Sequence, residues 1–151
     1  MQIFEISTRQ DLLESAIQYF WKCWGSDSNL SFYADCIEHS LDSKNELPKF
    51  YIVLENEEII ASYALLVNDI ISRQDLMPWF ACLFVNETHR NQGIAENLLN
   101  HACSEAKRKG FEMLYLSSDL VNFYERKGWE YHCQGYGVTG GEIKIYRKET
   151  A

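Results

Sequence analysis

The sequence of 151 residues lacks several features that would define its class at once. It has no apolar run long enough to cross a membrane, and residues 1–7 lack the basic start and apolar stretch of a signal peptide. Its five cysteines are an odd number and form no Cys-x-x-Cys pair, which argues against a disulfide framework and a zinc site. These absences predict a cytoplasmic protein with reduced thiols, no bound metal and no membrane partner.

Positive charge is also scarce, with 14 Lys and Arg against 22 Asp and Glu and a formal net charge of -8. Such a field repels polyanions and attracts cations, so we expect cationic partners and no nucleic acid. Basic residues gather at His89 and Arg90 and at residues 107–109. A hydrophobic fraction of 46% predicts a globular core, and the length suits one domain over residues 1–151.

Hydrophobic patterning predicts a regular series of elements without repeats or linkers. Ser7 and Gln10 form a capping box for the first helix, and Gly25, Gly110 and Gly128 suit helix ends. The order of elements predicts an α+β protein in which helices cover a mixed sheet. Strands are expected at residues 3–6, 50–54, 59–67, 79–85, 113–116, 129–134 and 143–147, and helices at 12–24, 30–41, 94–109 and 120–127.

The most informative stretch is residues 83–99, in which an apolar strand passes through a short polar loop into a helix. A helix N-terminus leaves backbone N–H groups without partners and carries partial positive charge, so it suits an anion. Gly93 and Ala95 leave room for a ligand, His89 and Arg90 make the loop basic, and no acid lies between Thr88 and Ala95. The pattern indicates a phosphate site, although an ordinary strand-loop-helix connection is also compatible with it.

Two familiar nucleotide loops do not fit this segment. No Gly-Lys-Ser/Thr follows the glycine, and the triple-glycine dinucleotide fingerprint is missing. The pattern Arg90-x-x-Gly93-x-Ala95 instead resembles the acetyl-CoA loop of the GNAT superfamily of N-acetyltransferases, Gln/Arg-x-x-Gly-x-Gly/Ala.

A second stretch, residues 116–129, resembles the other GNAT signature, Phe-Tyr-Glu-x-x-Gly-Phe. Phe123, Tyr124, Glu125 and Gly128 match it, with Trp129 in place of the last Phe. Two motifs in the right order are harder to obtain by chance than one, and the order of elements also resembles the GNAT fold. The resemblance implies a single-domain, bacterial-type member. Its fold would be a mixed, mostly antiparallel sheet of about seven strands, with strands 4 and 5 splayed and about four helices.

The resemblance also implies acetyl-CoA as the cofactor. In the family the loop binds the phosphates, and the exposed edge of the fourth strand pairs with the pantetheine arm like an added strand. Many members have an Asn where this sequence has Ser117, so that contact is open, with Asn122 among the substitutes. The implied cofactor-binding residues are Leu83, Phe84, Val85, Arg90, Asn91, Gln92, Gly93, Ile94, Ala95, Ser117 and Asn122.

Tyr124 matches the tyrosine that protonates the departing thiolate in the family. A phenol with a pKa of about 10 can protonate a thiolate whose conjugate acid has a pKa near about 8.5. The alternative is that Tyr124 only packs under the cofactor. Many members carry a Glu on the fourth strand as general base, but residues 79–85 contain no carboxylate. Asp75 is then a candidate base, beside Asp119 or a water held by backbone carbonyls.

The resemblance implies transfer of acetyl to a primary amine by direct attack in a ternary complex. Aromatic and acidic side chains suit a cationic small molecule or peptide, although they also describe two ordinary amphipathic helices. The alternative function is an acyl-CoA-binding module without turnover. Exposed edge strands are compatible with a homodimer. The residues expected to wall the acceptor are Tyr19, Trp21, Trp24, Tyr33, Asp27, Asp35, Glu38 and Asp75.

Overall fold

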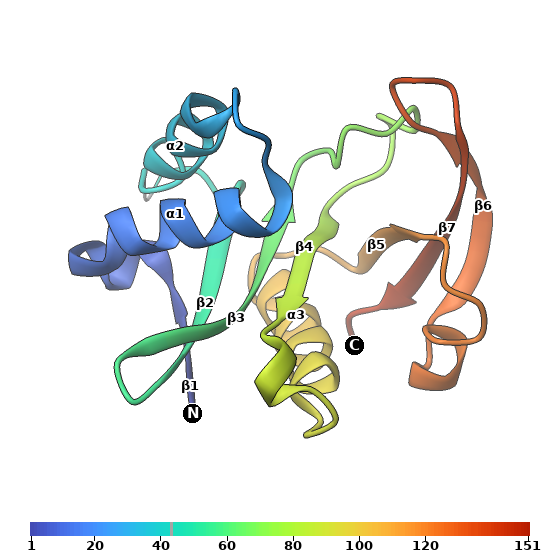
Figure 1. Cartoon of the computed structure of the whole chain (residues 1–151). Helices are drawn as coiled ribbons and strands as arrows, with labels where there is room; N and C mark the ends of the chain where they lie inside the picture. The colour runs from blue at the N-terminus through green and yellow to red at the C-terminus, as the bar shows by residue number, and fades with distance from the viewer. Residues whose placement is uncertain (43) are drawn as a thin grey trace. The chain divides into compact units, whose positions relative to one another are not determined.

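A computed structural model describes residues 1–42 and 44–151 of the chain (Figure 1). Its helices are α1 (Leu13–Trp24), α2 (Leu30–Glu38) and α3 (Ile94–Arg108). Its strands are β1 (Gln2–Glu5), β2 (Lys49–Glu55), β3 (Glu58–Leu66), β4 (Trp79–Val85), β5 (Met113–Ser118), β6 (Glu130–Tyr136) and β7 (Glu142–Glu149). Short 3-10 turns are η1 (Ile6–Thr8), η2 (Gln10–Leu12), η3 (Glu87–His89) and η4 (Glu125–Lys127).

The strands form a seven-stranded sheet in the order β1-β2-β3-β4-β5-β7-β6. Antiparallel ladders join β1 to β2, β5 to β7 and β6 to β7. The parallel pairing of β4 with β5 is recorded at Trp79 and Tyr115, where the Tyr115 N–H also donates to the Pro78 carbonyl at 3.1 Å. The predicted α+β fold with a mixed seven-stranded sheet is therefore confirmed, with three α-helices in the described part of the chain.

Backbone contacts divide the chain into two compact units. Unit 1 comprises Met1–Ala64 and Cys82–Ala95, and unit 2 comprises Leu65–Ala81 and Glu96–Ala151. Each unit therefore joins segments that are distant in sequence, and β3, β4 and α3 contribute residues to both. The prediction of one domain over residues 1–151 stays a prediction.

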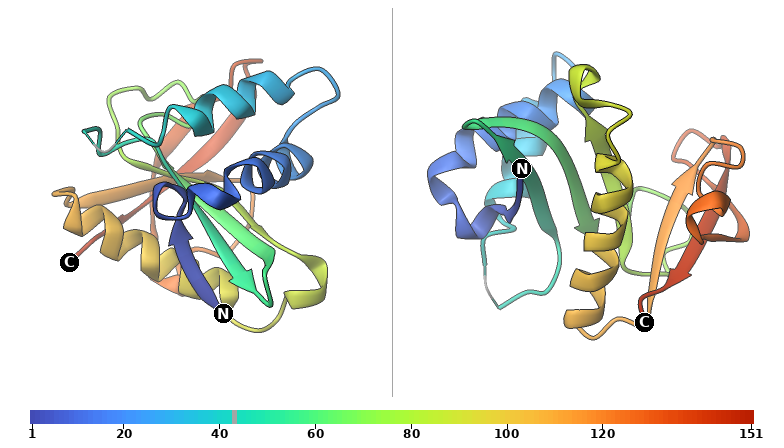
Figure 2. Two further views of the ribbon diagram at one scale, coloured as in Figure 1. Left: turned by 90° about the vertical axis from the view of Figure 1, so that its left-hand side faces the viewer. Right: turned by 90° about the horizontal axis from the view of Figure 1, so that it is seen from below.

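In unit 1, α1 and α2 lie against the same face of β2 and β3 (Figures 1 and 2). The apolar stripe of α1 buries Ala16, Ile17 and Phe20, because positions three and four residues apart share one side of a helix. Phe20 meets Phe50 of β2 edge to face, with ring centroids 5.2 Å apart. This packing fixes α1, which carries several of the aromatic residues predicted to wall the acceptor.

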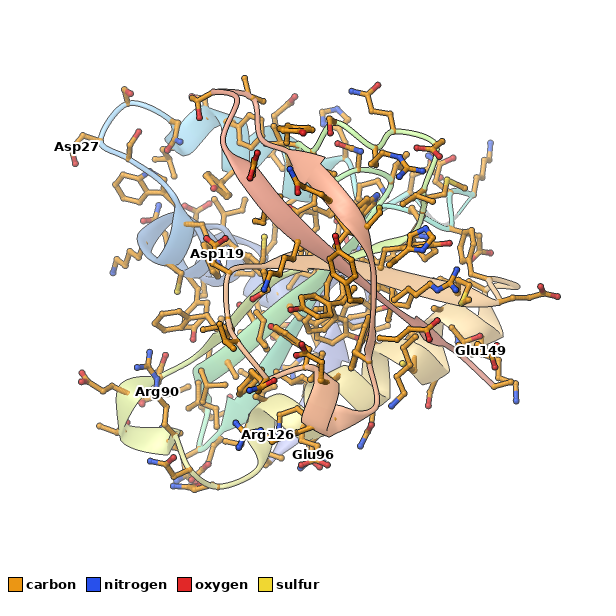
Figure 3. The ribbon with its side chains drawn as sticks, turned by 90° about the vertical axis from the view of Figure 1, so that its right-hand side faces the viewer. Asp27, Arg90, Glu96, Asp119, Arg126 and Glu149 are labelled. Carbon is orange, nitrogen blue, oxygen red and sulfur yellow. The ribbon has the colours of Figure 1, made fainter. Side chains whose placement is uncertain are left out.

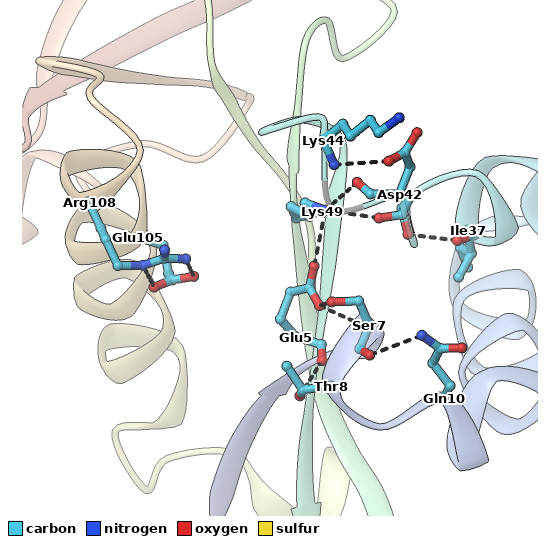
Figure 4. A network of polar contacts seen from close by, with 11 residues as sticks. Glu5, Ser7, Thr8, Gln10, Ile37, Asp42, Lys44, Lys49, Glu105 and Arg108 are labelled. Atoms are coloured by element: carbon cyan, nitrogen blue, oxygen red, sulfur yellow. Dashed lines mark hydrogen bonds and ion pairs between the residues drawn. The ribbon is translucent and has the colours of Figure 1, made fainter.

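Unit 1 also contains a buried lysine that joins three segments (Figure 4). The Nζ of Lys49 donates to the carbonyls of Ser40 at 3.1 Å and Asp42 at 3.2 Å, and it lies 3.5 Å from the carboxylate of Glu5. A buried amino group requires such partners because its desolvation is costly. The network holds β1 and the segment after α2 to the start of β2.

The predicted capping box at Ser7 and Gln10 is wrong. The carboxylate of Glu5 accepts from both the N–H and the hydroxyl of Ser7, so that hydroxyl does not cap a helix. The side-chain amide of Gln10 instead donates to the Ser7 carbonyl at 3.3 Å. Two 3-10 turns occupy residues 6–12, and α1 begins only at Leu13.

Two predicted helices are shorter than expected. α2 ends at Glu38, and the Ser40 hydroxyl then donates to the Ile37 carbonyl at 2.6 Å. The predicted helix at residues 120–127 is wrong, because Asn122 has a left-handed φ of 60° that a right-handed helix does not allow. Only the turn η4 forms there, and Gly128 ends it with a φ of 87°.

Unit 2 has its own apolar cluster. Ile71, Trp79 and Ile145 are buried together, and partly buried side chains, including those of Tyr115 and Cys133, pack around them. The indole N–H of Trp79 donates to the Leu76 carbonyl at 2.6 Å, which satisfies its only polar group. Across the described residues, no helix combines the length and apolar character that crossing a bilayer requires.

Candidate active site

The predicted anion loop lies in unit 1, between the end of β4 and the start of α3. Arg90, Asn91, Gln92 and Gly93 are exposed, and Asn91 and Gly93 have left-handed φ angles of 64° and 78°. A Cβ placed on Gly93 would meet no heavy atom within 4 Å, so the space beside it is open. The first N–H groups of α3 lack partners within the helix. The loop therefore fits a phosphate in shape and in charge.

The basic side chains of this loop fold back on unit 1. The Nε of Arg90 donates to the Val85 carbonyl at 3.0 Å, and its guanidinium lies 5.5 Å from the centre of the Phe84 ring. The Nε2 of His89 lies 3.6 Å from the Glu55 carboxylate. The loop therefore presents mainly backbone N–H groups, and fewer side chains, to an anion.

The predicted binding edge of β4 begins directly after a backbone kink. Cys82 has a left-handed φ of 56°, which costs an L-residue about 1–2 kcal/mol. The Ser62 hydroxyl donates to the Cys82 carbonyl at 3.1 Å and so helps to hold this conformation. Leu83, Phe84 and Val85 follow and are half-buried.

A polar group that the sequence analysis missed holds the end of β4. The hydroxyl of Tyr19 in α1 donates to the side-chain oxygen of Asn86 at 2.6 Å. Burial raises the pKa of Tyr19, so this hydroxyl keeps its proton at neutral pH. No motif contains Asn86, and its partner is 67 residues away in the chain, so sequence spacing carried no signal for the pair.

In unit 2, Tyr124 is buried in an aromatic cluster with 8% of its surface exposed. Its ring centre lies 4.9 Å from that of Phe123, 5.9 Å from Tyr146 and 6.2 Å from Trp129. Its carbonyl accepts from the N–H groups of Lys127 and Trp129 at 2.9 and 3.1 Å. Burial raises the pKa of Tyr124, so the phenol is protonated at neutral pH, as a proton donor must be.

Ser117 and Asn122 also belong to unit 2. Ser117 is half-buried on β5, opposite Ile145 of β7. Asn122 is exposed, and its carbonyl accepts from the Nε of Arg126 at 2.7 Å. The left-handed backbone of Asn122 is incompatible with the helix that the sequence predicted at residues 120–127. Unit 2 thus holds these two residues with Tyr124, and unit 1 holds the loop and the β4 edge.

The candidate bases differ in their environments. Asp75 is exposed and makes a two-pronged ion pair with Arg73 at 2.7 and 2.9 Å, which holds the pKa of its carboxyl below the usual range. Asp119 is exposed on the loop after β5 (Figure 3). Asp69, which the sequence analysis passed over, is partly buried, and burial raises its pKa to about 6. Beside it, the side-chain nitrogen of Asn68 is buried without a partner in the described structure.

Among residues 1–42 and 44–151, no group of three or more His, Cys, Asp or Glu side chains is placed to hold a metal ion.

Known structures share this fold. An acetyltransferase of the GNAT family from Desulfovibrio desulfuricans is 15% identical, with a TM-score of 0.73 and 99% of each chain covered. The aminoglycoside 6'-N-acetyltransferase from Enterococcus faecium is 16% identical, with a TM-score of 0.69 over 100% of this chain and 98% of that one. A GNAT acetyltransferase from Elizabethkingia anophelis with acetyl-CoA bound is 16% identical, with a TM-score of 0.67 over 98% and 97%.

No protein of curated function matches the sequence. The model of the acetyltransferase (GNAT) family, however, matches residues 13–129, which include both motifs and most of the chain. The resemblance predicted from those motifs is therefore confirmed, and the chain belongs to the GNAT family of acetyltransferases.

Proposed function

We propose that the protein transfers an acetyl group from acetyl-CoA to a primary amine by direct attack in a ternary complex. The observation that supports this most directly is the loop at residues 90–95. Gly93 is left-handed there and has open space beside it, at the start of a helix of 15 residues. Such a site binds the pyrophosphate of coenzyme A through backbone N–H groups.

Acetyl-CoA supplies the acetyl thioester that the amine attacks. Leu83, Phe84 and Val85 pair with the extended pantetheine arm through their backbone, as an added strand does. The kink at Cys82 precedes this segment and interrupts the regular course of β4. Backbone pairing of this kind tolerates almost any side chain, which suits the apolar composition of β4.

Tyr124 is proposed as the general acid. It donates the phenolic proton to the sulfur that departs from the acetyl group, and proton donation of this kind contributes about 10²–10⁴-fold to a rate. Burial keeps the phenol protonated, because a low dielectric disfavours the phenolate. The competing role, packing beneath the cofactor, would leave the rate unchanged when the hydroxyl is removed.

The attacking amine must also lose a proton. Asp75 stays a prediction for this role, but its ion pair with Arg73 lowers its pKa and makes it a weaker base. Asp119 and a water held by backbone carbonyls remain the other predicted choices. Burial raises the pKa of Asp69 to about 6, which is closer to neutral pH than the lowered pKa of Asp75.

The acceptor is proposed to be a cationic amine, either a small molecule or a peptide. The net charge of -8 attracts cations to the protein. Trp24 is an exposed aromatic residue at the end of α1, 45% accessible, and Asp27 follows it on the exposed turn before α2. The E. faecium neighbour acts on an aminoglycoside, a polycationic amine, which is consistent with this class of acceptor.

The second candidate function is an acyl-CoA-binding module without turnover. It is favoured by one observation, the lack of any carboxylate among residues 79–85 of β4. Acetyl transfer to any member of a broad panel of amines would exclude it. Binding of acetyl-CoA without transfer to any amine in that panel would support it.

Calorimetric titration of acetyl-CoA tests the proposal at its centre. We expect micromolar binding to the wild type and about 100-fold weaker binding to Gly93→Glu, because the carboxylate adds bulk and negative charge at the pyrophosphate site. Gly140→Glu is the matched control, since Gly140 is also left-handed, at 92°, with nothing within 4 Å of its Cβ position. Absence of binding to the wild type, or equal binding by both variants, would contradict the proposal.

A further inference from the structure

The end of β4 is fixed by α1. The Tyr19 hydroxyl donates to the side-chain oxygen of Asn86 at 2.6 Å. Asn86 is held a second time by β3, since its backbone N–H donates to the Ile60 carbonyl at 2.8 Å. Its side-chain nitrogen donates to the Ile59 carbonyl at 3.4 Å. Asn86 therefore joins α1 and β3 within unit 1.

Phe84 is held from several sides by the same helix and by the loop. The rings of Tyr19 and Trp24 meet it edge to face, with centroids 6.2 and 6.4 Å away. The Arg90 guanidinium lies over its face at 5.5 Å. Aromatic and cation–π contacts of this kind stabilise the position of the ring beyond the burial of its surface.

These contacts lead directly into the anion loop. Asn86 begins the turn η3, and its carbonyl accepts from the His89 N–H at 2.8 Å. The next residue, Arg90, is the first of the loop, and its side chain returns to Val85 and Phe84. The backbone between Asn86 and Arg90 is thus held at both ends by groups that α1 fixes.

We propose that Tyr19 is a positioning residue for the anion loop, acting through Asn86 and Phe84 and without contacting the ligand. This inference rests on the proposed function, since the loop is taken to bind the pyrophosphate of coenzyme A. The loop presents mainly backbone N–H groups, and their directions depend on where the chain leaves β4. Loss of the Tyr19 hydroxyl would remove the hydrogen bond that ties Asn86 to α1. The N–H groups of the loop would then have to be ordered when the ligand binds.

Tyr19→Phe is the first test, because it removes the hydroxyl and keeps the ring against Phe84. We expect the dissociation constant of acetyl-CoA, measured by calorimetry, to rise about three- to tenfold. We also expect faster amide hydrogen exchange at residues 87–95, with exchange in β2 unchanged. Tyr131→Phe is the matched control, since Tyr131 is an exposed tyrosine of unit 2, 53% accessible.

A second variant, Asn86→Ala, removes the partner of the same hydrogen bond. If the two residues act as a pair, the double variant should bind acetyl-CoA no more weakly than the weaker single variant, because coupled losses are not additive. Additive losses would contradict action through Asn86. If Asn86→Ala does not fold, Tyr19→Phe alone still tests the inference through acetyl-CoA binding and exchange at residues 87–95.

The outcomes separate this inference from the proposed function. If the wild type binds no acetyl-CoA, the proposed function fails, while hydrogen exchange at residues 87–95 in Tyr19→Phe still tests whether Tyr19 orders the loop. If the wild type binds and Tyr19→Phe binds equally well, with unchanged loop exchange, the inference fails and the proposed function stands. Exchange that rises equally in the loop and in β2 would mean a purely stabilising role and would also overturn the inference.

Discussion

The predicted site residues of unit 1 differ in kind from those of unit 2. In unit 1, residues 90–93 of the loop are exposed and the Arg90 side chain turns back to β4, so the loop offers mainly its backbone. In unit 2 the proposed acid is one buried side chain, Tyr124, surrounded by other rings. We propose from this comparison that unit 1 serves binding and unit 2 proton transfer.

The units also differ in how they treat buried polar groups. Unit 1 surrounds Lys49 with two carbonyls and the Glu5 carboxylate. Unit 2 contains Asp69, whose pKa is raised by burial, and an amide nitrogen of Asn68 without a partner in the described residues. A polar group that is buried without compensation reduces stability and often marks a functional position.

The largest effect is expected from Tyr124→Phe, which separates proton transfer from binding. We expect kcat for acetyl transfer to fall about 100-fold, within the range for loss of a general acid. The dissociation constant of acetyl-CoA should change less than about twofold, because the ring and its packing remain. Burial raises the pKa of Tyr124, so its phenol should stay protonated, and able to act as the acid, at a higher pH than an exposed tyrosine would. Steady-state kinetics and calorimetry measure both quantities.

Tyr131→Phe serves as the control for that change, since it removes an exposed hydroxyl of the same unit. If Tyr124→Phe retained full kcat, Tyr124 would have a packing role only. If it lost acetyl-CoA binding instead of kcat, the division between a binding unit and a proton-transfer unit would be wrong.

A smaller effect is expected from Asp69→Asn, which tests the uncompensated acid of unit 2. The folded-state pKa of about 6 lies above the unfolded value of about 3.9, so the folded state binds more protons between them. The free energy of unfolding should therefore fall as the pH rises from about 4 to 6 and stay lower above that range. Asp69→Asn should be more stable than the wild type at pH 7.5 by about 3 kcal/mol, with the difference vanishing near pH 4.

Urea unfolding at a series of pH values measures this difference directly. Asp119→Asn is the matched control, because Asp119 is an exposed acid of the same unit. Equal stability of wild type and Asp69→Asn at both pH 4 and pH 7.5 would show that the carboxyl of Asp69 is compensated after all.

The smallest effect is expected from Asp75→Asn on activity. The Arg73 guanidinium lowers the pKa of Asp75, so this carboxylate does not titrate between pH 6 and 9. The pH profile of acetyl transfer in that range should therefore match that of the wild type, with rates within about twofold. Loss of the acidic limb of the profile in this variant would instead establish Asp75 as the base.

Sequence patterns predicted the elements that depend on local chemistry. Apolar spacing located α1 through Ala16, Ile17 and Phe20, and all three are buried. Gly110 ends α3 with a left-handed φ of 93°, as its position after the helix predicted. Gly93 of the anion loop has a left-handed conformation that glycine adopts at little cost.

The features that were missed depend on a competing neighbour in the chain, on single backbone angles or on partners distant in sequence. Glu5 takes the Ser7 hydroxyl that was predicted to cap a helix, and Asn122 adopts a left-handed angle that stops another. The pairing of Tyr19 with Asn86 joins α1 to the end of β4, and only the fold brings them together. The raised pKa of Asp69 likewise follows from burial, which its polar sequence context did not indicate.

The buried position of Lys49 affects how readily the protein's own lysines can be acetylated. Thioesters acetylate free amines slowly without any enzyme, and the exposed amines of Lys22, Lys44 and Lys144 are open to that side reaction. The Lys49 side chain is only 7% exposed, and its amino group already donates to two carbonyls. The folded protein thereby shields Lys49 from acetyl donors. Its amino group keeps the positive charge that holds together the network of β1, β2 and the segment after α2.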